Sequence, residues 1–260
     1  MTQALWVAKT GLEAQQNKLA VISNNLANVS TTGFKRDRML FEDLLYQNIR
    51  QAGGQSSEDT ILPTGLMIGT GVRAVATQKQ NTQGNISQTG NQLDLAVLGR
   101  GYFQILKPDG TTAYTRDGTF SVNQDGQVVT SSGYHLEPSI TIAGDAQSVT
   151  IGTDGTVSVA LPGNSSSIAG VVQLADFINP AGLQPVGDNL FVETTASGTA
   201  QINNPTQSGL GSIAQGSLEG SNVNIVEELV SMIETQRAYE MNSKAISTAD
   251  EMLQYVNNNL

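Results

Sequence analysis

Apolar residues recur at seven-residue intervals at both ends of this 260-residue chain, and this repeat constrains the fold more than any other feature. Near the amino terminus the repeat contains Leu5, Leu12, Leu19 and Leu26, and Ile22 lies in a second row with Ala8 and Val29. The spacing predicts a helix with a coiled-coil seam. We expect the helix to end near Asn28, because turn-forming residues 30–33 follow it.

The last 40 residues repeat this pattern. Asn224 and Glu227 have the spacing of a capping box. The apolar seam that follows contains Ile225, Met232, Tyr239, Ile246, Leu253 and Leu260, with Leu229 beside it. A helix over residues 225–260 would be about 54 Å long at about 1.5 Å per residue. We therefore expect segments 1–30 and 222–260 to form a discontinuous coiled-coil domain that pairs within the chain and with neighbouring copies.

Before assembly, both terminal helices are expected to be largely unfolded, because an isolated apolar stripe buries too little surface to offset the ordering entropy.

The middle of the chain alternates apolar and polar residues with the period of β-strands, as at Phe103 and Ile105. Turn signals separate these runs at Asp109-Gly110, Asp117-Gly118, Asp125-Gly126 and Asp154-Gly155. We expect an all-β, hairpin-rich domain over residues 81–221, and we interpret the Gly/Pro/Asn-rich stretch 203–220 as its exit linker. The fold class is therefore α+β.

Residues 31–80 show little periodicity and are expected to form an extended connector between these two parts. Within the connector, the spacing of Phe41, Leu44, Leu45 and Ile49 hints at a short helix. The segment from Tyr46 to Val72 has no evident reason to exist in a compact monomer. One hypothesis is that it forms a strap, reaching a neighbouring subunit and keeping an assembly straight; the alternative is a mobile loop.

Composition limits the possible partners. The formal net charge of -10 disfavours nucleic acid and anionic lipid surfaces. The chain has no cysteine, which excludes disulfides and thiolate metal sites. No apolar run approaches the roughly 20 residues that span a bilayer, and residues 1–14 lack a basic leader followed by an apolar block. We expect no membrane insertion, no cofactor and no cleavable signal peptide.

Candidate catalytic groups are few. His135 is the only histidine, and a structural role is the better interpretation of it. A glycosidase pair could in principle be drawn from the carboxylates Asp94, Asp117, Asp125, Glu137 and Asp154. Several of these precede glycine, so hairpin turns explain them without catalysis. We expect no catalytic and no metal site.

Four segments resemble the bacterial flagellar rod and hook axial proteins: NNLANVSTTGFK (24–35), TGNQLDLAVLGRGYFQI (89–105), YTRDGTF (114–120) and SNVNIVEELVSMIETQRAYEMNSKAISTADEML (221–253). The family motif residues are Asn24, Asn25, Leu26, Ala27, Asn28, Gly33, Phe34, Gln236, Arg237, Ala238, Tyr239, Asn242 and Lys244. The length and the segment from Tyr46 to Val72 most resemble the distal rod members.

The resemblance implies a structural subunit that polymerises into a rigid, straight helical tube with the terminal helices innermost around an export channel. Such a shaft transmits torque from motor to hook through the periplasm. The implied partners are further copies of the chain, adjacent rod and hook axial proteins, surrounding bushing rings and the type III flagellar export apparatus. A hook or proximal rod subunit is an alternative, as is a secreted peptidoglycan-degrading enzyme.

Overall fold

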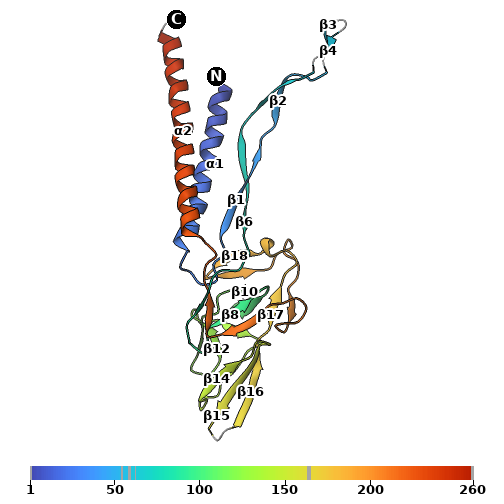
Figure 1. Cartoon of the computed structure of the whole chain (residues 1–260), viewed down its shortest axis with the longest axis vertical. Helices are drawn as coiled ribbons and strands as arrows, with labels where there is room; N and C mark the ends of the chain where they lie inside the picture. Colours follow the sequence, from blue (N-terminus) through green and yellow to red (C-terminus); the bar gives the residue numbers. More distant parts are fainter. Residues whose placement is uncertain (1, 54, 58–59, 62, 163–164, 259–260) are drawn as a thin grey trace. The chain divides into compact units, whose positions relative to one another are not determined.

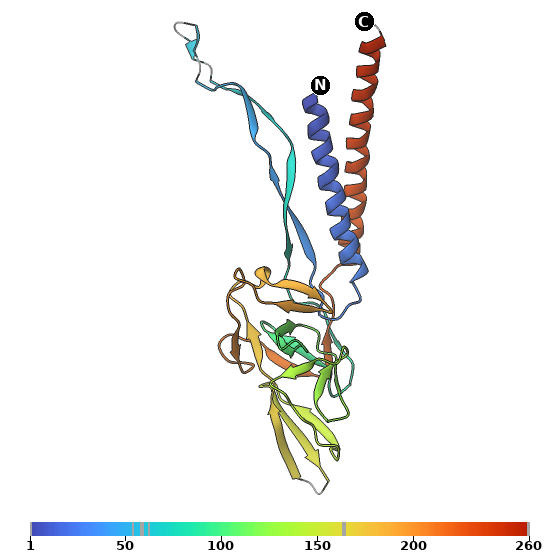
Figure 2. The same cartoon turned by 180° about the vertical axis from the view of Figure 1, so that it is seen from behind.

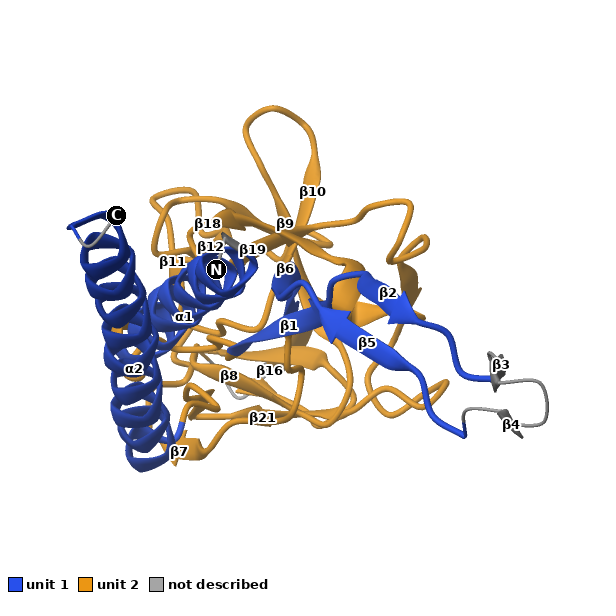
Figure 3. Cartoon of the chain, turned by 90° about the horizontal axis from the view of Figure 1, so that it is seen from above, with its two compact units in different colours: residues 1–26, 37–78, 224–260 blue, residues 27–36, 79–223 orange. Residues whose placement is uncertain are grey.

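A computed structural model describes residues 2–53, 55–57, 60–61, 63–162 and 165–258 (Figure 1). The chain forms two compact units (Figure 3): unit 1 comprises residues 1–26, 37–78 and 224–260, and unit 2 comprises residues 27–36 and 79–223. Residues 37–78 thus group with the terminal helices, and residues 27–36 group with the β-rich middle. From the sequence, the connector, residues 31–80, was instead expected to be separate from the discontinuous terminal domain, residues 1–30 and 222–260, and from the middle domain, residues 81–221.

Unit 1 contains both predicted helices, α1 (Thr2–Ala27) and α2 (Ile225–Asn258), which confirms the helical ends. The two helices lie side by side and run in opposite directions (Figures 1 and 2). Asn224 caps α2 as predicted, because its Oδ1 accepts a hydrogen bond from the backbone N–H of Val226 at 3.1 Å. Leu260, the last member of the predicted row, lies outside the described residues.

The described residues between 37 and 79 form an extended two-stranded ribbon (Figure 2), which belongs to unit 1 apart from Lys79. Its strands are β1 (Asp37–Asp43), β2 (Tyr46–Arg50), β3 (Gln55–Ser57), β4 (Thr60–Ile61), β5 (Leu66–Gly69) and β6 (Val72–Lys79). They pair as β1 with β6, β2 with β5 and β3 with β4, so the ribbon is one long hairpin.

The predicted short helix over Phe41, Leu44, Leu45 and Ile49 is wrong, because these residues lie in β1, β2 and the bend between them. Their spacing fits one helical face, but a longer-range pairing decides the conformation: Gln47 lies opposite Ile68, and Leu44 N–H donates to Gly71 O at 2.9 Å. Local periodicity cannot detect a partner strand about 20 residues away.

Unit 2 contains a nine-stranded sheet with the order β11-β12-β13-β9-β10-β19-β18, and β17 joins β20 to it at β9. Its strands are β9 (Tyr102–Leu106), β10 (Thr112–Thr115), β11 (Phe120–Val122), β12 (Val128–Thr130), β13 (His135–Glu137), β17 (Leu174–Asp176), β18 (Gln184–Gly187), β19 (Leu190–Val192) and β20 (Gln201–Asn203). A short 3-10 helix, η1 (Pro180–Gly182), precedes β18.

The remaining strands of unit 2 are β7 (Ile86–Gln88), β8 (Leu95–Leu98), β14 (Ser148–Ile151), β15 (Thr156–Leu161), β16 (Ser165–Val171), β21 (Ser212–Gln215) and β22 (Ser217–Glu219). Strands β14, β15 and β16 form a three-stranded sheet. The interpretation of residues 203–220 as a linker is wrong, because β21 pairs with β8 and β22 pairs with β7. Turn-rich composition hid two strands whose partners lie more than 100 residues earlier.

Three of the four predicted Asp-Gly turns are confirmed. Asp109-Gly110 joins β9 to β10, Asp125-Gly126 joins β11 to β12, and Asp154-Gly155 joins β14 to β15. The prediction of a hairpin at Asp117-Gly118 is wrong, because β10 and β11 are not neighbours in the sheet. Gly118 instead accepts a hydrogen bond from Leu95 N–H at 3.0 Å, which brings the two backbones too close for a side chain.

The hydrophobic core of unit 2 is formed by buried side chains from several of these strands. Phe103 and Ile105 of β9 are both fully buried, and the rings of Phe103 and Phe120 meet edge to face with centroids 5.2 Å apart. A second cluster is built from aromatic residues, where the rings of Tyr114 and Phe177 lie 4.8 Å apart. Packing of this kind makes unit 2 a domain with its own hydrophobic core.

Candidate assembly surface

Within unit 1, α2 carries a polar row that is buried in part, and one member of it approaches α1. Glu228 and Thr235 are buried and lie seven residues apart, and Asn242 continues the row. At this point the helices come close: a Cβ added to Gly11 would lie 3.0 Å from Nδ2 of Asn242. The row is displaced by three residues from the predicted apolar row, so the contact at Gly11 does not use the seam.

The predicted seam residues divide between the two helices. On α1, Ile22 is buried, and Leu5, Leu12, Leu19 and Leu26 are half-buried. On α2, Met232 and Ile246 are half-buried, whereas Ile225, Leu229, Tyr239 and Leu253 are exposed by 39% to 47%. The folded chain therefore covers the α1 part of the seam and leaves most of the α2 part in solvent.

Further apolar residues outside the predicted seam are exposed on α2. They are Val226, Val230, Ile233, Met241, Met252, Tyr255 and Val256, with exposed fractions from 45% to 72%. The first three follow helical spacing, a signal that was present in the sequence. At about 3.6 residues per turn these side chains lie on more than one side of α2, and exposed apolar surface of this extent marks an interaction site. We call this set, together with Ile225, Leu229, Tyr239 and Leu253, the α2 apolar face.

The ribbon also exposes apolar side chains. Leu45 is 88% exposed, and Phe41, Tyr46, Ile49, Leu66, Met67, Ile68 and Val75 are exposed as well. A polar ladder holds its strands together: Arg73 and Glu42 form an ion pair at 3.0 Å, and Arg38 donates to Gln78 at 3.1 Å. A hydrogen bond with Asp43 raises the pKa of Tyr46. Isolated two-stranded hairpins are marginally stable, so the ribbon would gain stability from contacts with another chain. Its exposed apolar side chains are available for such contacts.

Two contacts join the ribbon to α1. Asn25 is buried; its Nδ2 donates to Asp37 O and its Oδ1 accepts from Asp37 N–H, both at 2.9 Å. Further along, Val72 N–H donates to Thr10 Oγ1 at 3.4 Å, and a side chain on Gly71 would overlap that hydroxyl. The family motif residue Asn25 thus fixes where the ribbon begins.

The other motif residues at the amino-terminal end build the turn after α1. Gly33 has φ 68°, and a Cβ there would lie 2.6 Å from Asp117 N. Thr31 donates to Asn28 Oδ1 at 3.1 Å, and the Lys79 ammonium lies 5.2 Å from the Phe34 ring centroid. Asn24 and Ala27 are exposed, and Leu26 is half-buried.

The motif residues of α2 point mainly to solvent. Gln236, Arg237, Tyr239 and Lys244 are exposed, and Ala238 and Asn242 are half-buried. Apart from Asn242, the fold of a single chain therefore gives these residues little packing.

A buried ion cluster in unit 2 was missed by sequence reasoning. Glu219 Oε1 accepts from Lys35 Nζ at 2.6 Å, and Oε2 accepts from Arg116 Nη1 at 3.2 Å. Lys35 also donates to Thr82 O at 2.8 Å, and Arg116 Nη2 donates to Gly99 O at 2.6 Å. The side chains of Lys35 and Glu219 are fully buried. The cluster ties residues 27–36 and β22 to the rest of unit 2.

Burial lowers the pKa of Lys35 and outweighs the opposite effect of Glu219. The two cations share one carboxylate, so the cluster holds an excess positive charge. All three side chains lie in or beside the motif segments, but Lys35 and Glu219 are 184 residues apart, and no local pattern links them.

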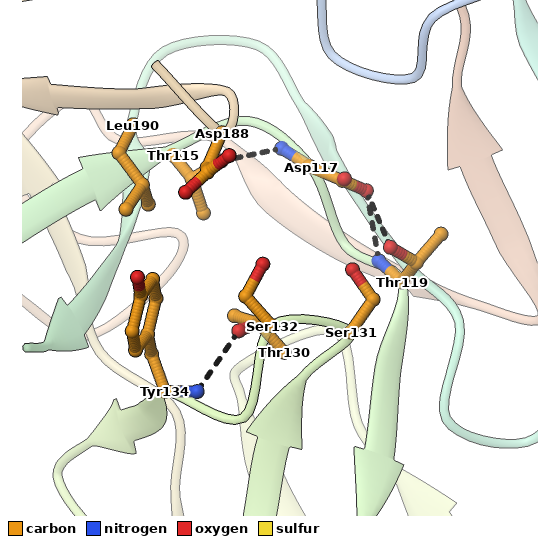
Figure 4. A pocket seen from close by; sticks show the side chains of 9 residues that line it. All are labelled: Thr115, Asp117, Thr119, Thr130, Ser131, Ser132, Tyr134, Asp188 and Leu190. Atoms are coloured by element: carbon orange, nitrogen blue, oxygen red, sulfur yellow. Dashed lines mark hydrogen bonds between the residues drawn. The ribbon is translucent and has the colours of Figure 1, made fainter. Parts of the chain in front are cut away.

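Local hydrogen bonds account for several of the candidate catalytic groups. The carboxylate of Asp94 accepts hydrogen bonds from Thr89 and Asn91, and His135 is half-buried in β13. Of the predicted carboxylates, Asp117 lines a small pocket with Asp188 (Figure 4). That pocket holds about 20 Å³, space for a single water and not for a glycan.

No group of three or more His, Asp or Glu side chains within the described residues is placed to hold a metal ion. Neither described helix has an apolar stretch long enough to cross a membrane.

Three protein families match separate parts of the chain. Residues 5–35 match "Flagella basal body rod protein", residues 96–159 match "Flagellar hook protein FlgE/F/G D1 domain", and residues 214–259 match "Flagellar basal body rod FlgEFG protein C-terminal". The first includes most of α1, the third includes the whole of α2, and the second falls in unit 2.

Relatives match over nearly the whole length. The flagellar basal-body rod protein FlgG of Buchnera aphidicola subsp. Schizaphis graminum is 54% identical over 98% of both chains. The FlgG of Caulobacter vibrioides is 51% identical over 97% of both, and that of Bacillus subtilis is 41% identical over 98% of this chain and 97% of its own. This chain belongs to the FlgG family of flagellar basal-body rod proteins, the distal rod proteins of the flagellum.

Proposed function

We propose that copies of this chain, a structural subunit of the flagellar distal rod, polymerise through the α2 apolar face into a straight, rigid tube around an export channel. The observation that carries the proposal is the exposure of this face in the single chain, while α2 uses a polar row where it meets α1 at Gly11. Leaving so much apolar surface in water is unfavourable, and contact with neighbouring helices removes it.

The seam residues of α1 and α2 would then pack as the inner layer of the tube, with Gln236, Arg237 and Lys244 supplying polar contacts between copies. A shaft of this kind transmits torque from motor to hook. Unit 2 would supply lateral contacts, and its buried core makes it stiff enough to do so.

The ribbon supports the strap hypothesis for Tyr46 to Val72, of which residues 54, 58, 59 and 62 lie outside the described residues. Its exposed apolar side chains, above all Leu45, are arranged on a hairpin that would gain stability from a neighbouring subunit. Deleting Gln51 to Leu62 should leave polymerisation intact and give bent rods in electron micrographs. Straight rods from this variant would contradict the strap.

We propose further copies of the chain, adjacent rod and hook axial proteins and surrounding bushing rings as partners, and the flagellar export apparatus as the route out of the cell. The location is the periplasmic rod of the basal body. The role is mechanical and not enzymatic.

Hydrogen exchange on free chain and polymer tests the assembly mode. Residues 225–258 should exchange faster in the free chain than in the polymer, because only assembly covers the α2 apolar face. Strand β9, buried in unit 2, should stay protected in both states and serves as the internal control. Equal protection of α2 in both states would contradict the proposal.

A further inference from the structure

Three Asp-Gly turns in unit 2 share one backbone conformation. In each, the glycine N–H donates at 3.0 Å to a carbonyl three residues earlier: Gly110 to Lys107, Gly126 to Asn123 and Gly155 to Gly152. The three glycines have φ angles of 78°, 79° and 85°. The three aspartates, Asp109, Asp125 and Asp154, are all exposed. The turns are therefore matched, apart from what each carboxylate contacts.

Two of the three carboxylates are held by a threonine two residues further on. Thr111 donates to Asp109 Oδ1 from its backbone N–H at 2.9 Å and from its hydroxyl at 2.5 Å. Thr156 donates to Asp154 in the same way, at 3.1 Å and 2.9 Å. These hydrogen bonds lower the pKa of both carboxyls. We call this arrangement the threonine clamp.

The third turn has no threonine clamp, because Gln127 stands where the others have threonine. The backbone N–H of Gln127 donates to Asn123 Oδ1 at 2.8 Å instead of to Asp125. Among the described residues, no hydrogen bond or ion pair reaches the Asp125 carboxylate. This side chain is free to rotate toward the backbone of Gly126.

We propose that Asp125 is a site of spontaneous isoaspartate formation, and that the threonine clamp suppresses the same reaction at Asp109 and Asp154. The Gly126 nitrogen attacks Asp125 Cγ, and an N–Cγ bond forms. The carboxyl loses one oxygen as water, with one proton from the amide nitrogen and one from the protonated carboxyl group. Water then hydrolyses the succinimide at either carbonyl, regenerating aspartate or giving isoaspartate. The net change is an isomerisation without oxidant or co-reactant.

The threonine clamp acts on both requirements of the attack. The reacting species is the protonated carboxyl, and hydrogen bonds to the carboxylate reduce its population. Attack also requires the side chain to turn toward the glycine nitrogen, which the threonine donors oppose. Glycine favours the reaction in all three turns because it has no side chain to obstruct the ring. Asp109 is held in addition by an ion pair with Lys107 Nζ at 3.4 Å, so Asp154 is the cleaner comparison for Asp125.

Isomerisation at Asp125 would disturb its surroundings. Gly126 O accepts a hydrogen bond from Ile142 N–H at 2.7 Å, and Val128 N–H donates to Ile140 O at 3.1 Å. Ile140 and Ile142 are buried in the core of unit 2. Isoaspartate adds one methylene to the main chain, so the backbone at Gly126 must shift against this anchored segment.

The test is to age the folded full-length chain at neutral pH and 37 °C and to quantify isoaspartate by electron-transfer fragmentation of chymotryptic peptides. The peptide Ser121–Tyr134 contains Asp125 as its only acidic residue, which makes the assignment unambiguous. We expect conversion at Asp125 to be roughly tenfold faster than at Asp109 and Asp154, about the factor that two ordinary hydrogen bonds supply. Similar conversion in all three turns would overturn the proposal.

Two variants at one position isolate the threonine clamp. Gln127→Thr should slow conversion at Asp125 to the level of Asp154, whereas Gln127→Val, of the same shape but without the hydroxyl, should leave it fast. A synthetic peptide of residues 121–134 verifies that the conditions permit the reaction. If that peptide isomerises and the folded chain does not, or if the two variants behave alike, the proposal is refuted.

Discussion

Replacing Ile233 by aspartate should block assembly while leaving the single chain folded. Ile233 is 50% exposed on α2 and belongs to the α2 apolar face. Burying an isoleucine fully contributes about 1.5 to 3 kcal/mol, and about half of that remains to be gained when Ile233 meets another copy. The variant loses this gain and must also desolvate or protonate a carboxylate at the contact.

Together these terms amount to about 2 to 4 kcal/mol per contact, which raises the critical concentration for polymerisation roughly 30- to 700-fold. The unfolding free energy of the single chain should change by only about 0.5 kcal/mol, because the substituted position is exposed on a helix. Thr235→Asp should instead lower the unfolding free energy of the single chain by much more, because Thr235 is 1% exposed and the new carboxylate would be buried.

The assay is sedimentation of polymer over a concentration series, with circular dichroism melting of the free chain in parallel. Ser247→Asp, which adds the same charge at an exposed polar position of α2, is the matched control for charge repulsion. If Ile233→Asp polymerises like the unmodified chain, or if its free chain melts much earlier, Ile233 does not serve assembly and the reasoning fails.

Three further predictions concern unit 2. Glu219→Gln should lower the unfolding free energy in urea by about 3 to 5 kcal/mol, because it leaves two buried cations without their anion. Lys35→Met should lower the unfolding free energy by less, because it removes the excess positive charge. Equal losses in the two variants would contradict this account. Gly33→Ala should destabilise the chain by about 1 to 3 kcal/mol in thermal unfolding, since φ 68° and the nearby Asp117 backbone exclude a Cβ. Burial raises the pKa of Tyr114 to about 12, above the unfolded value near 10, so the folded state retains the proton longer and stability should fall as pH rises from about 10 to about 12. Tyr114→Phe should reduce that slope in urea titrations at about pH 9 and about pH 11, and an unchanged slope would assign it to other groups.

The sequence predicted those parts of the fold that depend on neighbouring residues. The helix start at Asn224 was identified because a cap lies within one turn of the groups it satisfies. The turns at Asp109, Asp125 and Asp154 were identified for the same reason. The ribbon was not, because Gln47 needs Ile68 to become a strand residue.

On the candidate assembly surface, too, the sequence predicted local structure but not contacts between distant residues. The sevenfold repeat predicted the two terminal helices, but it could not indicate which residues of α2 approach α1. That choice depends on Gly11, whose missing side chain lets the backbone of α1 approach Asn242. The pairing of Lys35 with Glu219 was hidden by the 184 residues between them.

The amide of Asn25 has a mechanical consequence. By donating to and accepting from the main chain of Asp37, it imitates a neighbouring strand and pins the base of the ribbon to the last turns of α1. A rotation of α1 about its own axis is therefore passed to β1 by a short, directional linkage and is not absorbed by slack in the intervening turn. With the second contact at Thr10, the ribbon is held to α1 at two points along its length and follows that helix.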